Sequence, residues 1–117
     1  MIVGAVTDRR VPTISIAVGG AIYSAVIDTG FYGDLELPEA LRAEVSARPL
    51  AQSLSLFAGG VTIVEDLFLV DFPFDGQSVE AEASFVEGDE ILIGTKLLSA
   101  YRLEIDFVKR TVQIDKA

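Results

Sequence analysis

The 117-residue sequence contains no cysteine, no histidine and no tryptophan. Without Cys and His, a Ser-His-Asp triad, a cysteine nucleophile and the usual zinc sites are excluded. Any acid–base chemistry therefore depends on Asp, Glu, Lys or Tyr. The absence of Cys also permits a cytosolic location, because disulfides are rare there, without requiring one.

Positive charge is scarce as well. Nine Lys and Arg stand against 18 Asp and Glu, which gives a net charge of −9. Nucleic acids and anionic membrane surfaces select for basic patches, so we expect neither as a partner. No apolar run approaches the roughly 18 residues of a membrane span, and the start of the sequence lacks a signal-peptide pattern. We expect a soluble, cytoplasmic protein.

What the sequence does contain is apolar residues, which make up 50% of it, with only 4 prolines. This composition is typical of a packed globule, and the length predicts one domain over residues 1–117. A chain of this size buries about two-thirds of its unfolded surface. It needs neither a metal nor a disulfide for stability, and we expect no cofactor.

Short apolar or alternating segments at close spacing predict a mainly β domain. Gly19-Gly20 and Ala58-Gly59-Gly60 predict hairpin turns. A bend or an exit to solvent is expected at Glu65-Asp66, a connector at 47–50, and short helices after Pro38 and over 95–100. The expected strands are 1–6, 14–18, 21–27, 35–37, 52–57, 61–70, 79–85, 91–93, 103–107 and 111–115.

The stretch Asp28-Thr29-Gly30 ends the apolar segment 21–27 and is the strongest chemical signal. It places a carboxylate at the mouth of a hydrophobic interior, before a residue that can turn sharply. A buried carboxylate must be paired, hydrogen-bonded or protonated. Taken alone, the triplet also fits an Asp that ends a strand and caps its own turn.

Three features occur in order along the chain: apolar-apolar-Asp-Thr-Gly at 26–30, a glycine-tipped hairpin at 57–60, and apolar-apolar-Gly at 91–94 with Thr95 to Leu98 and the trailing segment 103–107. Together they resemble the retropepsin-like (clan AA) aspartic proteases, in particular the small single-domain prokaryotic type. The resemblance implies a closed retropepsin-like (acid protease) β-barrel with one or two short helices, forming a homodimer with a shared active site. It also implies an aspartic endopeptidase that cleaves extended peptide or protein substrates.

In this resemblance Asp28, Thr29 and Gly30 are the catalytic triplet, and one Asp28 from each subunit activates water. Thr29 would hydrogen-bond into the partner's loop. Phe57, Ala58, Gly59 and Gly60 would form the substrate-binding flap tip. Segment 91–93 would pack behind the active loop, apolar subsites would favour hydrophobic residues, and residues 1–6 and 111–115 would build an intersubunit sheet.

Two departures from viral retropepsins concern bracing and pocket shape. Phe31-Tyr32 follow the triplet where a small residue is usual, and Gly94-Thr95-Lys96 replaces Gly-Arg, whose bidentate fork Lys cannot reproduce.

Two other functions remain open: a non-catalytic dimeric peptide-binding or interaction module of the same fold, and a carboxylate-bound metal enzyme. The acidic turn with Glu87, Asp89 and Glu90 lacks an EF-hand spacing and is interpreted as a solvated turn.

Overall fold

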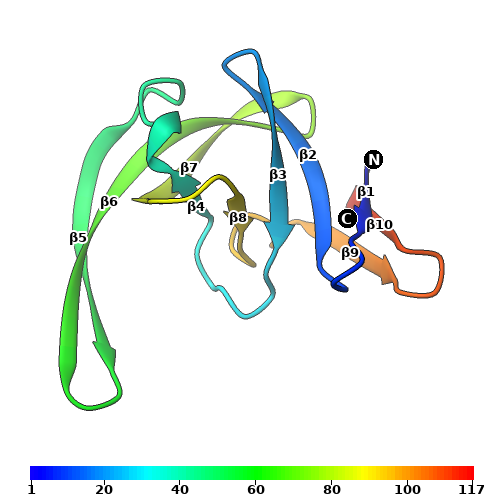
Figure 1. Cartoon of the computed structure of the whole chain (residues 1–117). Coiled ribbons are helices and arrows are strands. Elements are labelled where there is room, and N and C mark those ends of the chain that lie inside the picture. Colours follow the sequence, from blue (N-terminus) through cyan, green and yellow to red (C-terminus); the bar gives the residue numbers. More distant parts are fainter.

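The computed structural model contains ten β-strands and one short 3₁₀ turn (Figure 1). It describes the backbone of residues 1–117 and every side chain except those of Ser53, Ser55, Leu56 and Phe57. The elements are β1 (Ile2–Val6), β2 (Pro12–Val18), β3 (Ala21–Ile27), β4 (Leu35–Pro38), η1 (Glu39–Leu41), β5 (Arg48–Phe57), β6 (Val61–Phe74), β7 (Gln77–Val86), β8 (Ile91–Ile93), β9 (Tyr101–Asp106) and β10 (Thr111–Lys116).

All ten strands belong to one sheet with the order β5-β6-β7-β4-β8-β3-β2-β1-β10-β9. The mainly β architecture is therefore confirmed. The expected closure into a barrel is wrong, since β5 and β9 remain the two edges of the sheet. The reason is the β5–β6 hairpin, which extends away from the body as a long arm instead of curling back toward β9 (Figure 1).

The predicted turns between strands form where glycine permits a left-handed backbone. Gly19 and Gly20 have φ of 59° and 82°, as a two-residue turn matched to the twist of a hairpin requires. Gly59 and Gly60 behave likewise, with φ of 88° and 80°. Both hairpin predictions are confirmed by the antiparallel pairing of β2 with β3 and of β5 with β6.

The helix predicted over 95–100 is wrong, because these residues form consecutive turns. The short helix predicted after Pro38 is confirmed as the single 3₁₀ turn η1. Of the two alternatives at 65–66, the bend is wrong and the exit to solvent is confirmed, since residues 61–64 of β6 are exposed. Strand β6 continues without a break through residues 65–66, and the irregularity lies opposite, in β5 between Pro49 and Ala51. The expected connector 47–50 is mostly strand. Among the described residues, no helix has the length and apolarity needed to cross a bilayer.

A continuous core forms from the inward-facing residues of the alternating strands. On β4, for example, Leu35 and Leu37 are buried while Glu36 between them is half-buried. Because a strand presents successive side chains to opposite faces, this pattern fixes which face of each strand meets the core. The largest fully buried side chains include Ile14, Leu35, Leu37, Leu41, Val70, Phe72, Phe74, Ile91, Ile93, Val112 and Ile114.

The two terminal strands pair with each other within the chain. Ile2 to Ala5 of β1 lie antiparallel to Thr111 to Ile114 of β10, and β9 covers the other edge of β10. The two chain ends lie close together (Figure 1). Within the chain, the strands expected to join a partner's sheet are thus already paired, and β9 is the open edge at this end of the sheet.

Candidate active site

Asp28 lies immediately after the last residue of β3, on a loop that runs to β4. Its carboxylate Oδ1 accepts a hydrogen bond from the Gly30 N–H at 2.9 Å, and its own carbonyl accepts one from the Phe31 N–H at 3.2 Å. Asp28 is half-buried, whereas Thr29 and Gly30 are exposed. The carboxylate therefore stands at the surface of the core with Oδ1 oriented by the loop's own backbone.

The loop is held from behind by β8, as predicted. Strand β8 pairs in parallel with β3, and the Asp28 N–H donates to the Ile93 carbonyl at 2.9 Å. Beyond β8, the Thr95 and Lys96 N–H groups donate to the carbonyls of Phe31 and Gly33 at 2.9 and 3.2 Å. The loop is thus hydrogen-bonded at residues 28, 31 and 33 to a segment that lies more than sixty residues further along the chain.

Gly94 allows this close approach. A Cβ added there would lie 2.2 Å from the Gly33 carbonyl oxygen and 2.7 Å from the Phe31 carbonyl oxygen. Both contacts are with backbone atoms, which cannot move aside as a side chain can, so any larger residue at position 94 would displace the loop. The Gly94 N–H also donates to the Asp34 carbonyl at 3.0 Å. The sequence showed a glycine after an apolar run, but only the structure identifies what the glycine accommodates.

Asp34 and Lys96 contact the same part of the molecule; Lys96 was noted from sequence at the bracing position, whereas Asp34 was not. The buried Asp34 accepts a hydrogen bond from the Glu82 N–H at 2.9 Å through Oδ2. Lys96 Nζ lies 2.9 Å from Glu82 Oε2, and this ion pair raises the pKa of Lys96. Thr95 Oγ1 donates to the Phe31 carbonyl at 3.3 Å. Thr95 and Lys96 therefore hold the loop through backbone hydrogen bonds, and the Lys96 side chain pairs with Glu82 of β7.

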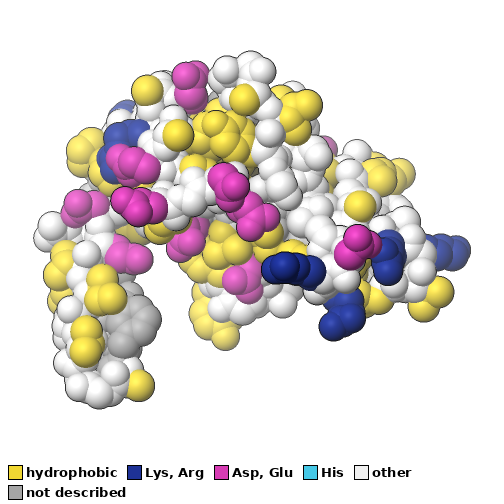
Figure 2. All heavy atoms as spheres, in the orientation of Figure 1, with side chains coloured by type: hydrophobic (Ala, Val, Ile, Leu, Met, Phe, Trp, Pro, Cys, Tyr) yellow, Lys and Arg dark blue, Asp and Glu magenta, His cyan; other side chains and the backbone are white. Residues whose placement is uncertain are grey.

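The hairpin β5–β6 carries the expected flap tip. Ala58, Gly59 and Gly60 form its turn, and Phe57 ends β5, although the Phe57 side chain lies outside the described residues. The hairpin and the loop after β3 project in the same direction from the sheet (Figure 1). The structure thus places the candidate flap and the candidate catalytic loop on one side of the molecule, separated by a concave surface (Figure 2).

A cavity of ≈ 460 Å³ lies beside the loop, where β6 and β7 meet it. Glu65 and Leu67 of β6 line it together with the loop segment 31–35, Glu82 and Ser84. A second cavity of ≈ 230 Å³ is lined by Val26, Glu36, Val86, Leu92 and the turn 87–91. Both cavities adjoin segments that lead directly into or out of the Asp28 loop.

The half-buried Glu36 is the residue with the most informative electrostatics. Burial raises the pKa of its carboxyl above the ordinary value of 4.5, and the charges of Glu65 and Asp28 raise it further. These three carboxyl groups therefore lie within electrostatic reach of one another. The alternation of the segment 35–37 gave a signal for this, because it places an acid on the face opposite two core leucines.

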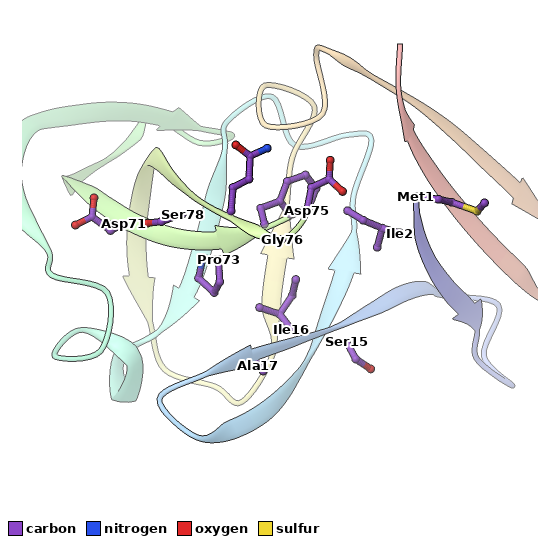
Figure 3. A pocket seen from close by; sticks show the side chains of 12 residues that line it. Met1, Ile2, Ser15, Ile16, Ala17, Asp71, Pro73, Asp75, Gly76 and Ser78 are labelled. Carbon is purple, nitrogen blue, oxygen red and sulfur yellow. The ribbon is translucent and has the colours of Figure 1, made fainter.

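A larger cavity of ≈ 550 Å³ lies elsewhere and shares no residue with the loop (Figure 3). It is enclosed by Met1 and Ile2 of β1, by residues 15–17 of β2 and by the β6–β7 turn. Asp71 and Asp75 are its only titratable side chains among the described lining residues. Asp75 accepts a hydrogen bond from the Tyr101 hydroxyl at 3.3 Å. Nothing in this cavity adds to the chemistry expected at Asp28.

Other acidic residues lie apart from the loop. Glu104 of β9 pairs with Arg102 at 3.1 Å, and Asp106 caps the following turn by accepting the N–H groups of Val108 and Lys109. The acidic turn at 87–90 is exposed. Among the side chains that the structure describes, no group of three or more acids is arranged to hold a metal ion.

Comparison with known proteins identifies the fold. No protein-family model and no curated protein sequence matches the chain. Solved structures do: a retropepsin-like aspartic protease from Rickettsia conorii, with a TM-score of 0.64 and 16% identity, covers 98% of this chain, which spans 89% of that one. The Simian Foamy Virus (mac) protease, with a TM-score of 0.60 and 24% identity, covers 74% of this chain, which spans 91% of that one.

The foamy viral protease–reverse transcriptase is similar over 80% of this chain, with a TM-score of 0.59 and 22% identity. This chain spans only 13% of that longer protein. At these identities the comparison establishes the fold and nothing finer. The chain therefore has the retropepsin-like fold of aspartic proteases, and its Asp-Thr-Gly loop follows β3 and is hydrogen-bonded to β8.

Proposed function

We propose that this protein is an aspartic endopeptidase that acts as a homodimer, with one Asp28 from each subunit activating water. The observation that carries the proposal is the Asp28-Thr29-Gly30 loop, hydrogen-bonded to β8 within a fold shared with aspartic proteases. The half-buried carboxylate has no Lys or Arg within ion-pair distance among the described side chains.

The chemistry needs two carboxyl groups in different protonation states. Two carboxyls a few ångströms apart cannot both ionise, so they share one proton and titrate as a unit. The ionised one takes a proton from water, whose oxygen attacks the peptide carbonyl carbon, while the protonated one gives its proton to the carbonyl oxygen. In the collapse of the resulting diol, the carboxyl group that is now protonated gives its proton to the leaving nitrogen and the C–N bond breaks. The other carboxylate takes a proton from a diol hydroxyl as the carbonyl re-forms, so the pair again holds one proton.

A homodimer follows from this requirement, because each chain supplies one such Asp. A two-fold axis beside the loop brings two copies of Asp28 together. Thr29 and Gly30 are exposed in the single chain, which is the expected state of residues that meet a partner's loop. In this assembly the Thr29 hydroxyl hydrogen-bonds across the axis and holds the two loops in register.

The β5–β6 hairpin closes over the substrate in this proposal. An extended peptide would add to it as a strand does, with backbone hydrogen bonds supplying affinity and side-chain pockets supplying selectivity. Gly59 and Gly60 have open space around them and left-handed backbones, so the turn tolerates rearrangement on closure. The exposed apolar residues Val61 and Ile63 on β6 become covered when substrate binds.

The decisive experiment is peptide cleavage by the variant Asp28→Asn, which keeps the shape of the side chain and removes the shared proton. We expect the rate to fall by about a thousandfold or more, as for other groups that act directly on the reacting atoms. Asp8→Asn, at an exposed turn, is the matched control and should leave cleavage unchanged. Undiminished cleavage by Asp28→Asn would exclude the mechanism.

A mixing experiment tests the shared site. Excess Asp28→Asn protein added to wild type should form heterodimers with one competent acid, and the wild-type activity should fall as they form. Ultracentrifugation over the same concentrations should show a dimer. Activity that is insensitive to the added variant, or a protein that remains a monomer while it cleaves peptides, would contradict the proposal. A dimer that binds peptides without cutting them between about pH 3 and 8 would instead favour a peptide-binding module.

A further inference from the structure

Glu36 lies on the same face of the sheet as the residues that lead into Asp28. Strand pairing aligns Val26 of β3 with Leu92 of β8, and Leu92 with Glu36 of β4. The neighbours of Glu36 on its own strand, Leu35 and Leu37, are buried on the opposite face. Since residues two apart share a face, Val26 and Asp28 continue the same row. The row therefore runs from the candidate catalytic acid, over two apolar residues, to a second carboxyl group.

A cavity of ≈ 230 Å³ opens over this row. Its floor is apolar and contains Val26, Ile91 and Leu92, and carboxylates stand around it on Glu36 and on the turn 87–90. Lys and Arg side chains have the matching form, with an apolar stem that packs on hydrophobic surface and a charged end that seeks an anion. A purely apolar substrate side chain would contact the apolar lining but would leave the carboxylate of Glu36 beside it without a cationic partner.

Glu36 has no cationic partner in the chain. All nine Lys and Arg side chains are described, and none lies within ion-pair distance of Glu36 or Glu65. Burial raises the pKa of the Glu36 carboxyl, and the charges of Glu65 on β6 and of Asp28 on the loop raise it further, so the three acids lie within electrostatic reach of one another. Figure 2 shows Asp and Glu side chains gathered between the base of the hairpin and the loop after β3.

We propose that Glu36 makes the substrate cleft selective for peptides that carry a Lys or Arg side chain close to the cleaved bond. The inference rests on the proposed peptidase function and names its substrate class. Val26 and Leu92 receive the stem of the substrate residue, and Glu36, assisted by Glu65, receives its positive charge. It replaces the expectation of purely hydrophobic subsites, which the apolar floor alone would have supported.

Two-fold symmetry extends this selectivity to both sides of the bond. A homodimer presents one Glu36 on each side of the paired Asp28 residues. The preferred substrate therefore carries basic residues on both flanks of the scissile bond. The protein's net charge of −9 favours encounter with such cationic segments. Because the interaction is electrostatic and partly exposed, added salt should weaken it.

The test uses matched peptides built on a sequence cleaved in a library digest, with Lys, norleucine or Glu at the two positions on either side of the bond. We expect wild type to cleave a Lys peptide at least about tenfold faster in kcat/KM than its norleucine counterpart, and the Glu peptide more slowly than both. Glu36→Gln should remove most of this preference while it retains cleavage of norleucine peptides. Glu44→Gln, which changes the net charge equally at an exposed position, should keep it.

Binding measurements separate the inference from the function on which it rests. Fluorescence anisotropy with Asp28→Asn protein, with and without Glu36→Gln, reports the Lys preference without any cleavage. If peptides are cut but Lys and norleucine are treated alike, the charge selectivity is wrong and the peptidase function stands. If nothing is cut yet the Lys peptide binds more tightly in a Glu36-dependent way, the selectivity stands and the peptidase function fails. Neither cleavage nor a binding preference would overturn both.

Discussion

The loop after β3 and the outer part of the β5–β6 hairpin flank the same concave surface but are stabilised differently. The loop is hydrogen-bonded through residues 28–33 to backbone groups of residues 93–96. The hairpin is held by its own ladder, which runs from Phe57↔Val61 down to Arg48↔Leu69. Apolar side chains follow the same division. Ile91 and Ile93 behind the loop are fully buried, whereas Leu54 on the hairpin is 72% exposed.

The contacts of the loop suit it to hold a side chain in a fixed position, whereas those of the hairpin suit it to cover a bound molecule. A loop fixed by backbone contacts from a distant segment cannot shift without breaking several hydrogen bonds at once. A hairpin with exposed apolar residues gains free energy when another surface covers them. In the proposed peptidase, the first part orients Asp28 and the second closes over the peptide. Substitutions in the two parts test this division.

The largest effect is expected from Gly94→Ala behind the loop. The new Cβ would collide with the carbonyl oxygens of Gly33 and Phe31, so the loop or β8 must move. We expect the free energy of unfolding to fall by about 3 kcal/mol and peptide cleavage to be lost with the loop geometry. Denaturant unfolding at fixed protein concentration measures the first effect, and peptide hydrolysis the second.

Gly59→Ala on the hairpin is the matched comparison, because open space surrounds Gly59 and only its positive φ resists a side chain. The expected loss is about 1 kcal/mol. Equal losses for the two variants would mean that the loop is no more constrained than the hairpin. The loop after β3 and the β5–β6 hairpin would then not differ in rigidity.

An intermediate effect, on binding alone, is expected from Ile63→Ser. Ile63 shares a face of β6 with Glu65 and Leu67, which line the cavity beside the loop. Because Ile63 is 45% exposed, its loss should change the free energy of unfolding by less than about 0.5 kcal/mol. The KM for an extended peptide should rise several-fold with kcat little changed.

Val64→Ser is the control, on the opposite face of the same strand. It should alter neither stability nor KM, although Val64 is as apolar and as exposed as Ile63. A larger rise in KM for Val64→Ser than for Ile63→Ser would show that the other face of the hairpin meets the substrate.

The smallest effect concerns the stability of the protein as a function of pH, through Glu36. The pKa of its carboxyl is raised in the folded protein, so the folded state binds more protons than the unfolded state above about pH 4.5. Ionised Glu36 therefore destabilises the fold as the pH rises through its folded pKa. Glu36→Gln should increase the free energy of unfolding at pH 7 by roughly 0.5 kcal/mol, since the group is partly solvated.

The same gain should disappear below the ordinary Glu pKa of 4.5, where Glu36 is protonated in both states. Thermal unfolding at pH 4 and pH 7 measures the difference, with Glu44→Gln as a control. If Glu36→Gln destabilised the protein at pH 7, Glu36 would have to make a favourable contact, and its interpretation as an unpartnered carboxylate would be wrong.

Most strand positions could be predicted because alternation and glycine turns are local signals. Segment 21–27 and the turn at Gly19-Gly20 are examples, and both formed as expected. The helix expected over 95–100 did not form: the N–H groups of Ser99 and Tyr101 donate to the carbonyls three residues earlier, as in successive turns. The local pattern therefore indicated a compact segment but not its hydrogen-bond spacing.

The candidate site likewise contains one residue with a local sequence signal and several that depend on tertiary contacts. Asp28 could be identified from sequence, because an acid that follows an apolar strand and precedes Thr-Gly is conspicuous. The contacts of the supporting residues could not, since the buried Asp34 and the backbone contact at Gly94 join segments about fifty to sixty residues apart, and Lys96 pairs with Glu82 on a different strand. Glu36 gave only a weak signal, as one acid between two leucines.

The sequence by itself determined which residues turn, which alternate and which acid stands at the end of an apolar strand, because each depends on neighbours a few positions away. Only the tertiary structure decided that the sheet stays open, how residues 94–96 are hydrogen-bonded to the loop, and that the charges of Glu65 and Asp28 reach Glu36. Strand register and long-range hydrogen bonds govern these features, and they form only when distant segments pack against each other.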